Sequence, residues 1–210
     1  EEETEGKLTL GRKAVLQVGY RYVKLDYEKN TVRLMKPGMR MGLGAVAKGY
    51  GVDMAVRVLR ANKVNDFIVD GGGDLFVAGK HPERAWRVGI KDPRKPATHF
   101  ASFDVKNRAV VTSGDYERFF MVGGKRYHHI LDPRTGQPAQ GLMSVTVVAP
   151  TAMMADALAT ATFVLGPRKG YAFVTKYADS ECILVTKQGQ VMISPGLRDK
   201  VKKREVTKGP

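Results

Sequence analysis

The chain has 210 residues, of which 43% are hydrophobic and 27% are charged. This composition is typical of a folded globular protein and excludes the collagen-like and disordered classes. A chain of this length buries roughly two-thirds of its unfolded surface without a disulfide or a structural metal. Its one cysteine, Cys182, excludes an intrachain disulfide scaffold. No segment approaches the roughly 18 apolar residues of a membrane-spanning helix.

The chain is strongly basic, with 35 Lys and Arg against 21 Asp and Glu and a net charge of +14. A basic surface favours an anionic partner, which includes nucleic acids, lipid headgroups and phosphorylated small molecules. Only 8% of the residues are aromatic, and they lie in apolar strand patterns rather than beside Lys and Arg, as base stacking requires. We therefore expect no nucleic-acid partner and keep a basic nucleic-acid-binding protein as the more remote alternative.

The hydrophobic pattern predicts many strands and few helices. A hairpin is predicted over 20–26 and 31–35, because its side chains alternate on either side of a polar turn. A first helix is predicted from Gly44 to about Asn62, because its apolar residues recur on one face. A second helix is predicted over 151–165 and a third over 168–177. Further strands are predicted at 66–70, 74–78, 86–91, 102–105, 109–112, 117–122, 127–131, 144–148, 182–186 and 191–194.

These elements lack the regular strand–helix alternation of a parallel sheet. We therefore predict an α+β fold, in which helices pack on a largely antiparallel sheet. Residues 1–19 are expected to be a polar leader or the remnant of a missing N-terminal region, and residues 20–196 the folded core. Residues 197–210 carry six basic and two acidic residues, and we expect them to form a solvated basic tail.

The second predicted helix carries the first candidate site. It is apolar almost all round, and Asp156 and Thr160 lie four residues apart on one of its faces. A buried carboxylate is costly unless something compensates its charge. One interpretation is structural: Asp156 accepts backbone N–H groups or pairs with an Arg, and Thr160 bonds back to a helix carbonyl. The other is that both oxygens are ligands for Mg²⁺, which takes one or two carboxylates together with waters and phosphate.

Two glycine-rich segments are candidate ligand sites. Gly42 and Gly44 precede the first helix, and Lys48 follows within its first turn or so, so free backbone N–H groups and an ammonium could face an anion. The alternative is a plain glycine-rich entry with a solvated lysine. Residues Gly71–Gly73 most simply form a tight hairpin turn. The alternative is a place where a ligand lies against bare backbone.

His128 and His129 are adjacent at the end of a predicted strand, before a turn-forming segment. Their rings point to opposite faces of the strand, so at most one of them can enter a given pocket. A histidine at a strand end is a candidate general base, although a single histidine is more often structural.

Six stretches of the chain, in this order, resemble the FAD:protein FMN transferase family, also called ApbE. The set covers most of residues 20–166 and is highly specific as an ordered series. The stretches are GLGAVAKGYGVD (Gly42–Asp53), VDGGGDLFVAG (Val69–Gly79), WRVGIKDPR (Trp86–Arg94), VVTSGDYERFF (Val110–Phe120), YHHILDPRTGQP (Tyr127–Pro138) and SVTVVAPTAMMADALATATFVLG (Ser144–Gly166).

The resemblance implies a Mg²⁺-dependent transferase that takes FAD as its substrate. Such an enzyme cleaves FAD, transfers FMN to a Thr or Ser hydroxyl of an acceptor protein and releases AMP. It also implies a location in the bacterial cell envelope. A catalytically impaired FAD-binding module and an FAD pyrophosphatase are the alternatives within the same resemblance.

The resemblance assigns roles to individual residues. The side chains of Asp156 and Thr160 and the main-chain carbonyl of Ala45 would hold the metal, and His129 would be the catalytic base. The positions that match contacts to the flavin dinucleotide are Lys48, Glu117 and Ile130.

Two departures from the family pattern accompany this resemblance. Gly42 stands where the family usually has Asp, so that a flavin contact is absent. The family's long segment before the region that matches Tyr20, which supplies part of the FAD pocket, is also missing. Three explanations are open: the chain is a fragment, a second chain completes the site, or FAD binding is weakened.

Overall fold

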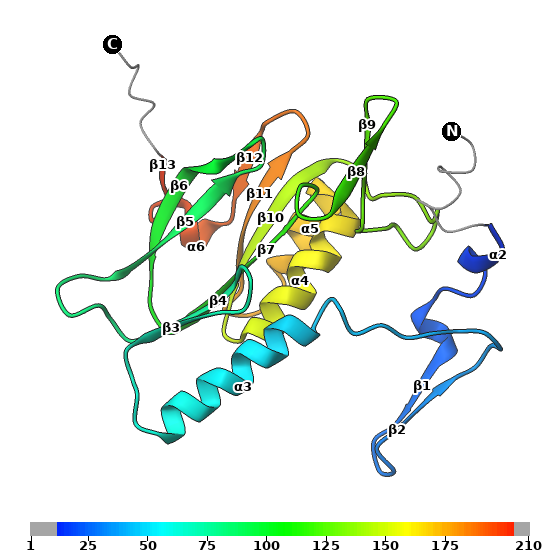
Figure 1. The fold of residues 1–210 in the computed structure, drawn as a ribbon, viewed down its shortest axis with the longest axis horizontal. Helices are drawn as coiled ribbons and strands as arrows, with labels where there is room; N and C mark the ends of the chain where they lie inside the picture. Colours follow the sequence, from blue (N-terminus) through cyan, green and yellow to red (C-terminus); the bar gives the residue numbers. More distant parts are fainter. Residues whose placement is uncertain (1–11, 204–210) are drawn as a thin grey trace.

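The computed structural model describes residues 12–203 and arranges them in three layers (Figure 1). The middle layer is a six-stranded sheet with the order β12-β11-β10-β7-β4-β3, in which every neighbouring pair is antiparallel. Its strands are β3 (Phe67–Asp70), β4 (Asp74–Ala78), β7 (Arg108–Gly114), β10 (Leu142–Ala149), β11 (Glu181–Thr186) and β12 (Val191–Ile193). This arrangement confirms the predicted α+β class.

Each face of this sheet is covered by another layer. Three helices lie on one face: α3 (Ala47–Ala61), α4 (Ala152–Leu165) and α5 (Pro167–Val174). A smaller antiparallel sheet packs on the other face and consists of β5 (Trp86–Asp92), β6 (Lys95–Val105) and β13 (Lys202–Lys203). Successive side chains of a strand point to opposite faces, so Val110 packs with the small sheet and Val111 with the helices. All eight residues of β10 are buried, including the polar Ser144 and Thr146.

The helices α3 and α4 approach each other very closely at Gly49. A Cβ added there would lie 2.3 Å from the carbonyl oxygen of Ala152, so only glycine fits between the two backbones. Asp53 of α3 then receives the first amides of α4, from Ala152 at 2.7 Å and Met153 at 2.9 Å. A helix start carries free N–H groups that a carboxylate satisfies. The side chain of Asp53 therefore fixes how α4 begins against α3.

Several element boundaries differ from the predicted ones. The first helix begins at Ala47, three residues later than predicted, because residues 44–46 form a turn. Strand β6 starts at Lys95, seven residues earlier than predicted, because its polar first half pairs with β5 as a hairpin arm. The strand predicted at 117–122 is β8 (Phe119–Val122), which leaves Glu117 in the preceding turn. The pattern also did not reveal that the strands divide into separate sheets.

The ordered fold extends beyond the predicted start of the basic tail. The short helix α6 (Pro195–Arg198) places Leu197 in the core beneath the small sheet, and β13 pairs with Ser102 and Ala101 of β6. The prediction of a tail from residue 197 was therefore wrong for 197–203, because one buried leucine outweighs the surrounding charge. Residues 204–210 of that tail and residues 1–11 of the predicted leader lie outside the described residues.

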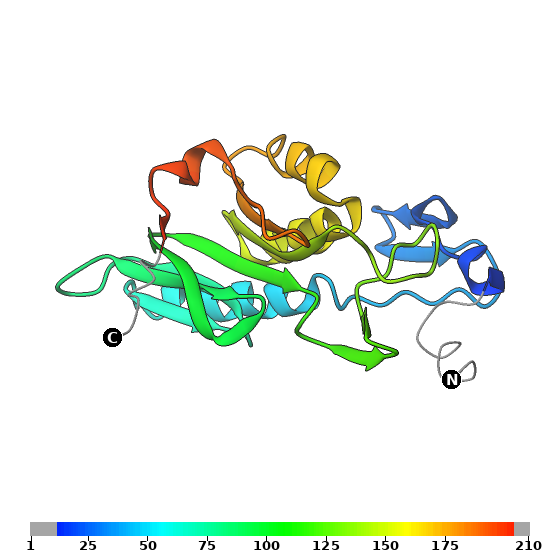
Figure 2. The same cartoon turned by 90° about the horizontal axis from the view of Figure 1, so that it is seen from above.

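Two hairpins extend from the layers (Figures 1 and 2). The first, formed by β1 (Val23–Asp26) and β2 (Thr31–Leu34), confirms the predicted hairpin and follows α2 (Arg12–Val15) and the 3₁₀ helix η1 (Tyr20–Tyr22). The second is formed by β8 and β9 (Lys125–His128). Within residues 12–203, no helix has the length and apolar character needed to cross a membrane.

Candidate active site

Asp156 is buried where α4 passes the beginning of α3. The residue is only 5% exposed, and its Oδ2 accepts a hydrogen bond of 3.2 Å from the backbone N–H of Gly49. Burial raises the pKa of this carboxyl group, and the Gly49 amide and the charge of Lys48 partly oppose that shift. No arginine in the described part of the chain pairs with it. Of the partners that the structural interpretation expects for Asp156, the described residues supply one backbone amide and no arginine.

The hydrogen bond from Gly49 has a consequence for Ala45. In an α-helix the N–H of residue i donates to the carbonyl of residue i−4, which would pair Gly49 with Ala45. Here the Gly49 amide donates to Asp156, and the Ala45 carbonyl oxygen accepts no hydrogen bond from any described residue. The residue is exposed in the turn that leads into α3. The carbonyl that the resemblance assigns to the metal is therefore free.

Thr160 lies one helical turn after Asp156 on the same face of α4. Its Oγ1 is 3.4 Å from the Oγ of Ser113 on β7, and it does not bond back to a carbonyl of its own helix. The predicted alternative of back-bonding was therefore wrong, since the hydroxyl faces the neighbouring strand. Asp156 and Thr160 thus present their oxygens toward the α3 and β7 side of the helix.

The sequence interpretation missed Asp74. This residue begins β4, is 1% exposed, and its carboxyl group interacts electrostatically with that of Asp156. The ammonium of Lys48 lies 2.8 Å from its Oδ1 and 3.4 Å from the carbonyl oxygen of Gly72. Burial raises the pKa of Asp74 to about 6, and Lys48 opposes that shift. The available signal was an acidic residue directly before the apolar run of a buried strand.

The glycine turn beside Lys48 is the predicted hairpin turn. Strands β3 and β4 pair antiparallel, and the amide of Gly71 donates to the carbonyl of Asp74 at 2.9 Å. The predicted anion site at the start of α3 is changed by the structure, because the Gly49 amide already serves a carboxylate. Lys48 itself remains about half exposed. Gly42 faces open space, with no atom within 4 Å of a Cβ placed there.

The two adjacent histidines point in opposite directions, as the strand periodicity predicts. His128 is buried, with Nε2 donating to the carbonyl of Ala139 at 3.1 Å and its ring edge-on to Phe163 of α4. His129 is exposed just after β9, and its Nδ1 lies 3.2 Å from the carbonyl oxygen of Arg118. A carbonyl can only accept, so Nδ1 of His129 carries the proton. Its Nε2 is then a free lone pair, which is what a general base requires.

The other two candidates for the flavin dinucleotide lie near this hairpin. Glu117 is exposed in the turn between β7 and β8. Ile130 is only 6% exposed, its side chain packs in the core, and its carbonyl accepts the amide of Ala139 at 2.9 Å. A ligand contact of Ile130 would therefore use main-chain atoms.

Helix α4 connects the two parts of the site. Asp156 contacts the start of α3, Thr160 contacts β7, and Phe163 packs on His128. Residues 156 and 163 are seven apart, which corresponds to about 10 Å along a helix axis. The structure therefore brings Lys48, Asp74 and Asp156 together where α3 meets α4, with Ala45 in the turn before α3 and Thr160 one helical turn further along α4. His129 lies toward the other end of α4, next to the residue that packs on Phe163. It shows no direct contact between His129 and the carboxylates.

The oxygens at the α3–α4 junction fit a magnesium ion. Both oxygens of Asp74 are buried and accept no hydrogen bond of normal geometry, and they face a second buried carboxylate. Within residues 12–203, no cluster of three or more His, Cys, Asp or Glu side chains could hold a metal by itself. Mg²⁺ needs only one or two carboxylates and completes its shell with carbonyls, waters and phosphate. Asp156, Thr160 and the free Ala45 carbonyl supply such a donor set.

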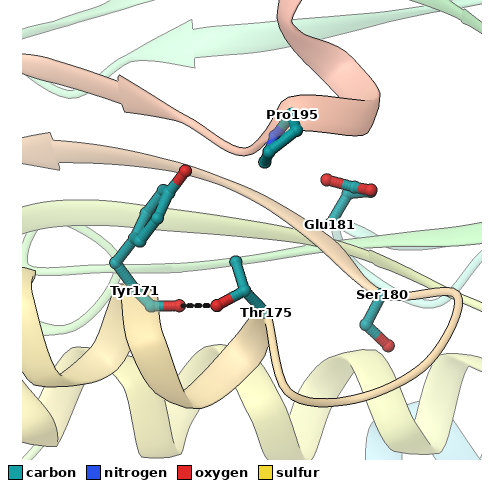
Figure 3. Close-up of a pocket in the computed structure, with 5 residues that line it drawn as sticks. All are labelled: Tyr171, Thr175, Ser180, Glu181 and Pro195. Carbon is teal, nitrogen blue, oxygen red and sulfur yellow. Dashed lines mark hydrogen bonds between the residues drawn. The ribbon is translucent and has the colours of Figure 1, made fainter.

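Two other concave regions lie away from these residues. The cavity in Figure 3 has a volume of about 320 Å³ and is lined by Tyr171, Thr175, Ser180, Glu181 and Pro195. The hydroxyl of Thr175, at the C-terminal end of α5, donates to the carbonyl of Tyr171 at 3.1 Å. Figure 3 marks this hydrogen bond with a dashed line. A second concave region, of about 680 Å³, is lined by residues of the β1–β2 hairpin. None of the candidate site residues lines either region.

The chain is similar to a known family and to several named proteins. The sequence model of the ApbE family matches residues 6–184. A protein of Treponema pallidum named FAD:protein FMN transferase is 41% identical over 187 residues, which cover 82% of this chain and 51% of the relative. A Klebsiella pneumoniae protein of the same name is 39% identical and is covered to 54%. The chain therefore spans about half the length of these relatives.

Solved structures show the same fold. The crystal structure of the ApbE protein of Thermotoga maritima superposes with a TM-score of 0.82 at 37% identity, covering 97% of this chain and 64% of the other. The flavin transferase ApbE of Vibrio cholerae superposes with a TM-score of 0.79 at 27% identity, covering 90% of this chain and 60% of the other.

Proposed function

We propose, because the chain belongs to the ApbE family, that it is the core of an FAD:protein FMN transferase. The proposed reaction cleaves FAD in the presence of Mg²⁺, transfers FMN to a Thr or Ser hydroxyl of an acceptor protein and releases AMP. The observation that carries this proposal is the α3–α4 junction, where buried carboxylates face each other beside a free carbonyl oxygen. We also propose a location in the bacterial cell envelope, on the resemblance alone.

The residues of the site have separable roles in this reaction. Asp156, Thr160 and the Ala45 carbonyl would hold Mg²⁺, which when bound offsets negative charge on phosphate oxygens. The ammonium of Lys48 is about half exposed and can bind a phosphate oxygen of the dinucleotide. Glu117 and the main chain at Ile130 lie near His129 on the hairpin side and would contact the remainder of FAD.

His129 supplies the proton acceptor. The acceptor hydroxyl oxygen forms a bond to the phosphorus on the FMN side, and the bond from that phosphorus to the AMP oxygen breaks. The hydroxyl proton passes to Nε2 of His129, while the Arg118 carbonyl keeps the proton on Nδ1 and fixes the ring. An unactivated hydroxyl is a weak nucleophile, so this proton transfer is needed as the new bond forms.

The test is to incubate the chain with FAD, Mg²⁺ and a protein that accepts FMN on a Thr or Ser hydroxyl. We expect release of AMP and an increase of the acceptor mass by one FMN, both lost on chelation of the metal. A preliminary measurement is the melting temperature, which FAD with Mg²⁺ should raise because a ligand that binds only the native state stabilises it. If FAD binds but no AMP is released and the acceptor mass does not increase, the proposal is contradicted.

A second candidate is an FAD-binding module that does not transfer FMN, or that only hydrolyses FAD. The open space at Gly42 favours it, because the side chain that the family usually places there is missing and nothing else fills its position. Restoring the side chain in Gly42→Asp should then tighten FAD binding. AMP release without an acceptor adduct would identify the pyrophosphatase.

A further inference from the structure

The family resemblance gives no role to Asp74, yet this residue is the most completely buried carboxylate near the site. It is held at the start of β4 by pairing with Val111 of β7, and its two oxygens accept no hydrogen bond of normal geometry. Buried carboxylates in folded proteins are paired or coordinate a metal. Asp74 has one ion-pair partner, Lys48, whose side chain is 51% exposed. That partner compensates one oxygen and leaves Oδ2 without a donor.

Strand β4 packs against both α3 and α4, and the negative charge of Asp156 acts on the carboxyl group of Asp74. Among the described residues, the donors around the two carboxyl groups are one amide from Gly49, which binds Asp156, and the ammonium of Lys48, which pairs with Asp74. Two facing carboxylates repel each other strongly where water is excluded. A divalent cation between them removes this repulsion and replaces the missing donors of Asp74.

The chemistry of the surrounding atoms favours a cation over a proton shared by the two carboxyl groups. The Ala45 carbonyl is free and belongs to the same turn of chain as Lys48 and Gly49. A shared proton would satisfy the two carboxylates but not a carbonyl oxygen, whereas an oxygen-seeking cation is satisfied by all three.

We propose that Asp74 is a second carboxylate ligand of the divalent-cation site, and that Lys48 holds it in place until the cation binds. This inference rests on the proposed function, since it uses the cation site at Asp156. Lys48 would then leave Asp74 when the cation arrives, and its ammonium would become available to a phosphate. The structural alternative is that Asp74 serves only to anchor Lys48.

The test is a calorimetric titration of the full chain with Mn²⁺ alone, without nucleotide. The variants are Asp74→Asn and Asp156→Asn, and Asp70→Asn is the matched control. Asp70 is exposed at the end of β3, beside the same turn, and within the described residues its side chain accepts only the amide of Gly73. We expect Asp74→Asn and Asp156→Asn each to weaken Mn²⁺ binding at least about tenfold, as loss of a metal-site contact does, and Asp70→Asn to bind like the unmodified chain.

The outcomes separate this inference from the proposed function. Unchanged Mn²⁺ binding in Asp74→Asn, together with weakened binding in Asp156→Asn, would overturn the role of Asp74 and leave the proposed function standing. Unchanged binding in both variants, or no binding by the unmodified chain, would overturn the cation site and with it both proposals.

A second measurement covers the case in which the variant perturbs the fold. Without metal, Asp74→Asn removes one of two repelling charges and also the ion pair with Lys48, so the decisive quantity is the rise in melting temperature that Mn²⁺ causes, which should be smaller in the variant than in the unmodified chain. If Asp74 only anchored Lys48, Mn²⁺ would raise the melting temperature of the folded variant as much as that of the unmodified chain. That result would overturn the inference.

Discussion

The α3–α4 junction and the β8–β9 hairpin carry the two halves of the candidate site in contrasting surroundings. At the junction, Asp74 and Asp156 are buried between a sheet and two helices that meet at Gly49. The hairpin extends from the layers (Figure 2), and Phe120 and Met121 of β8 are exposed. The groups that would bind the cation are thus fixed by core packing, whereas the proposed base lies on a hairpin that extends from the core.

The end of the β8–β9 hairpin that joins the core is nevertheless firmly held. Asp115 is buried between β7 and β8, and both of its oxygens accept hydrogen bonds of 2.8 Å from Arg94. Arg126 of β9 adds an ion pair to Asp115, and its guanidinium lies 4.0 Å from the ring centre of Phe119. A bidentate arginine–carboxylate pair fixes both distance and orientation. His129 therefore lies at the anchored end of the hairpin. Because the proposed cation ligands and the proposed base lie in separate regions, single mutations should perturb cation binding and proton transfer separately.

The largest effect is expected from removing the carboxylate at the junction. Asp156→Ala should abolish Mg²⁺-dependent AMP release, because the proposed cation loses its main anionic ligand. The fold should remain, since within residues 12–203 the side chain of Asp156 loses one hydrogen bond, the one from the Gly49 amide. Enzyme assays with FAD, together with circular dichroism, measure the two effects. Activity equal to that of the unmodified chain would remove Asp156 from the site.

The corresponding change on the hairpin should slow transfer without weakening FAD binding. His129→Ala removes the proposed base, and the loss of such a group typically costs about 100- to 10,000-fold in rate. FAD affinity, measured by fluorescence quenching, should stay unchanged because the residue is exposed and, within the described residues, its ring hydrogen-bonds only to the carbonyl of Arg118. If rate and affinity fell together, His129 would be a binding residue instead.

The close helix contact gives a prediction on stability. Gly49→Ala places a methyl group against the backbone of Ala152, and such overpacking typically costs about 1–3 kcal/mol in the free energy of unfolding. Gly51→Ala is the matched control, because Gly51 lies in the same helix with open space around it. Exchanging Gly for Ala there should stabilise the helix by up to about 1 kcal/mol. Urea unfolding of both variants tests the pair, and equal stabilities would contradict the close approach.

The smallest effect concerns pH and the buried histidine. Burial lowers the pKa of His128, while the Ala139 carbonyl and Asp115 oppose that shift and Lys187 and His129 add to it. The unfolded chain therefore takes up the proton first, and stability falls as pH drops below about 6.5, by at most about 1.4 kcal/mol per pH unit.

The Gln variant at this position tests that dependence. His128→Gln keeps a donor for the Ala139 carbonyl and cannot titrate, so its unfolding free energy between pH 7 and pH 5 should change less than that of the unmodified chain. His99→Gln, at an exposed histidine, is the control and should follow the unmodified chain. Identical pH profiles for all three proteins would show that His128 is not protonated on unfolding.

Much of this architecture follows from patterns in the sequence. The apolar helix with Asp156 and Thr160, the glycine turn before Asp74 and the opposite faces of the two histidines all depend on local periodicity, which the sequence displays directly. The pairing of Asp74 with Asp156 does not, because it joins residues 82 positions apart through packing of β4 against α4. The sequence likewise gives no sign that the Ala45 carbonyl lacks its helical hydrogen bond, because the Gly49 amide donates instead to Asp156 of another helix. The division of strands into two layers depends on the same long-range packing.

The most direct test is a crystal of the chain soaked with FAD and Mn²⁺, measured for anomalous scattering. The account predicts one strong anomalous peak bonded to a carboxylate oxygen of Asp156 and to the Ala45 carbonyl, with a phosphate of the dinucleotide as a further ligand. An Asp156 carboxylate that keeps only its protein donors, with FAD bound and the metal peak elsewhere, would contradict it.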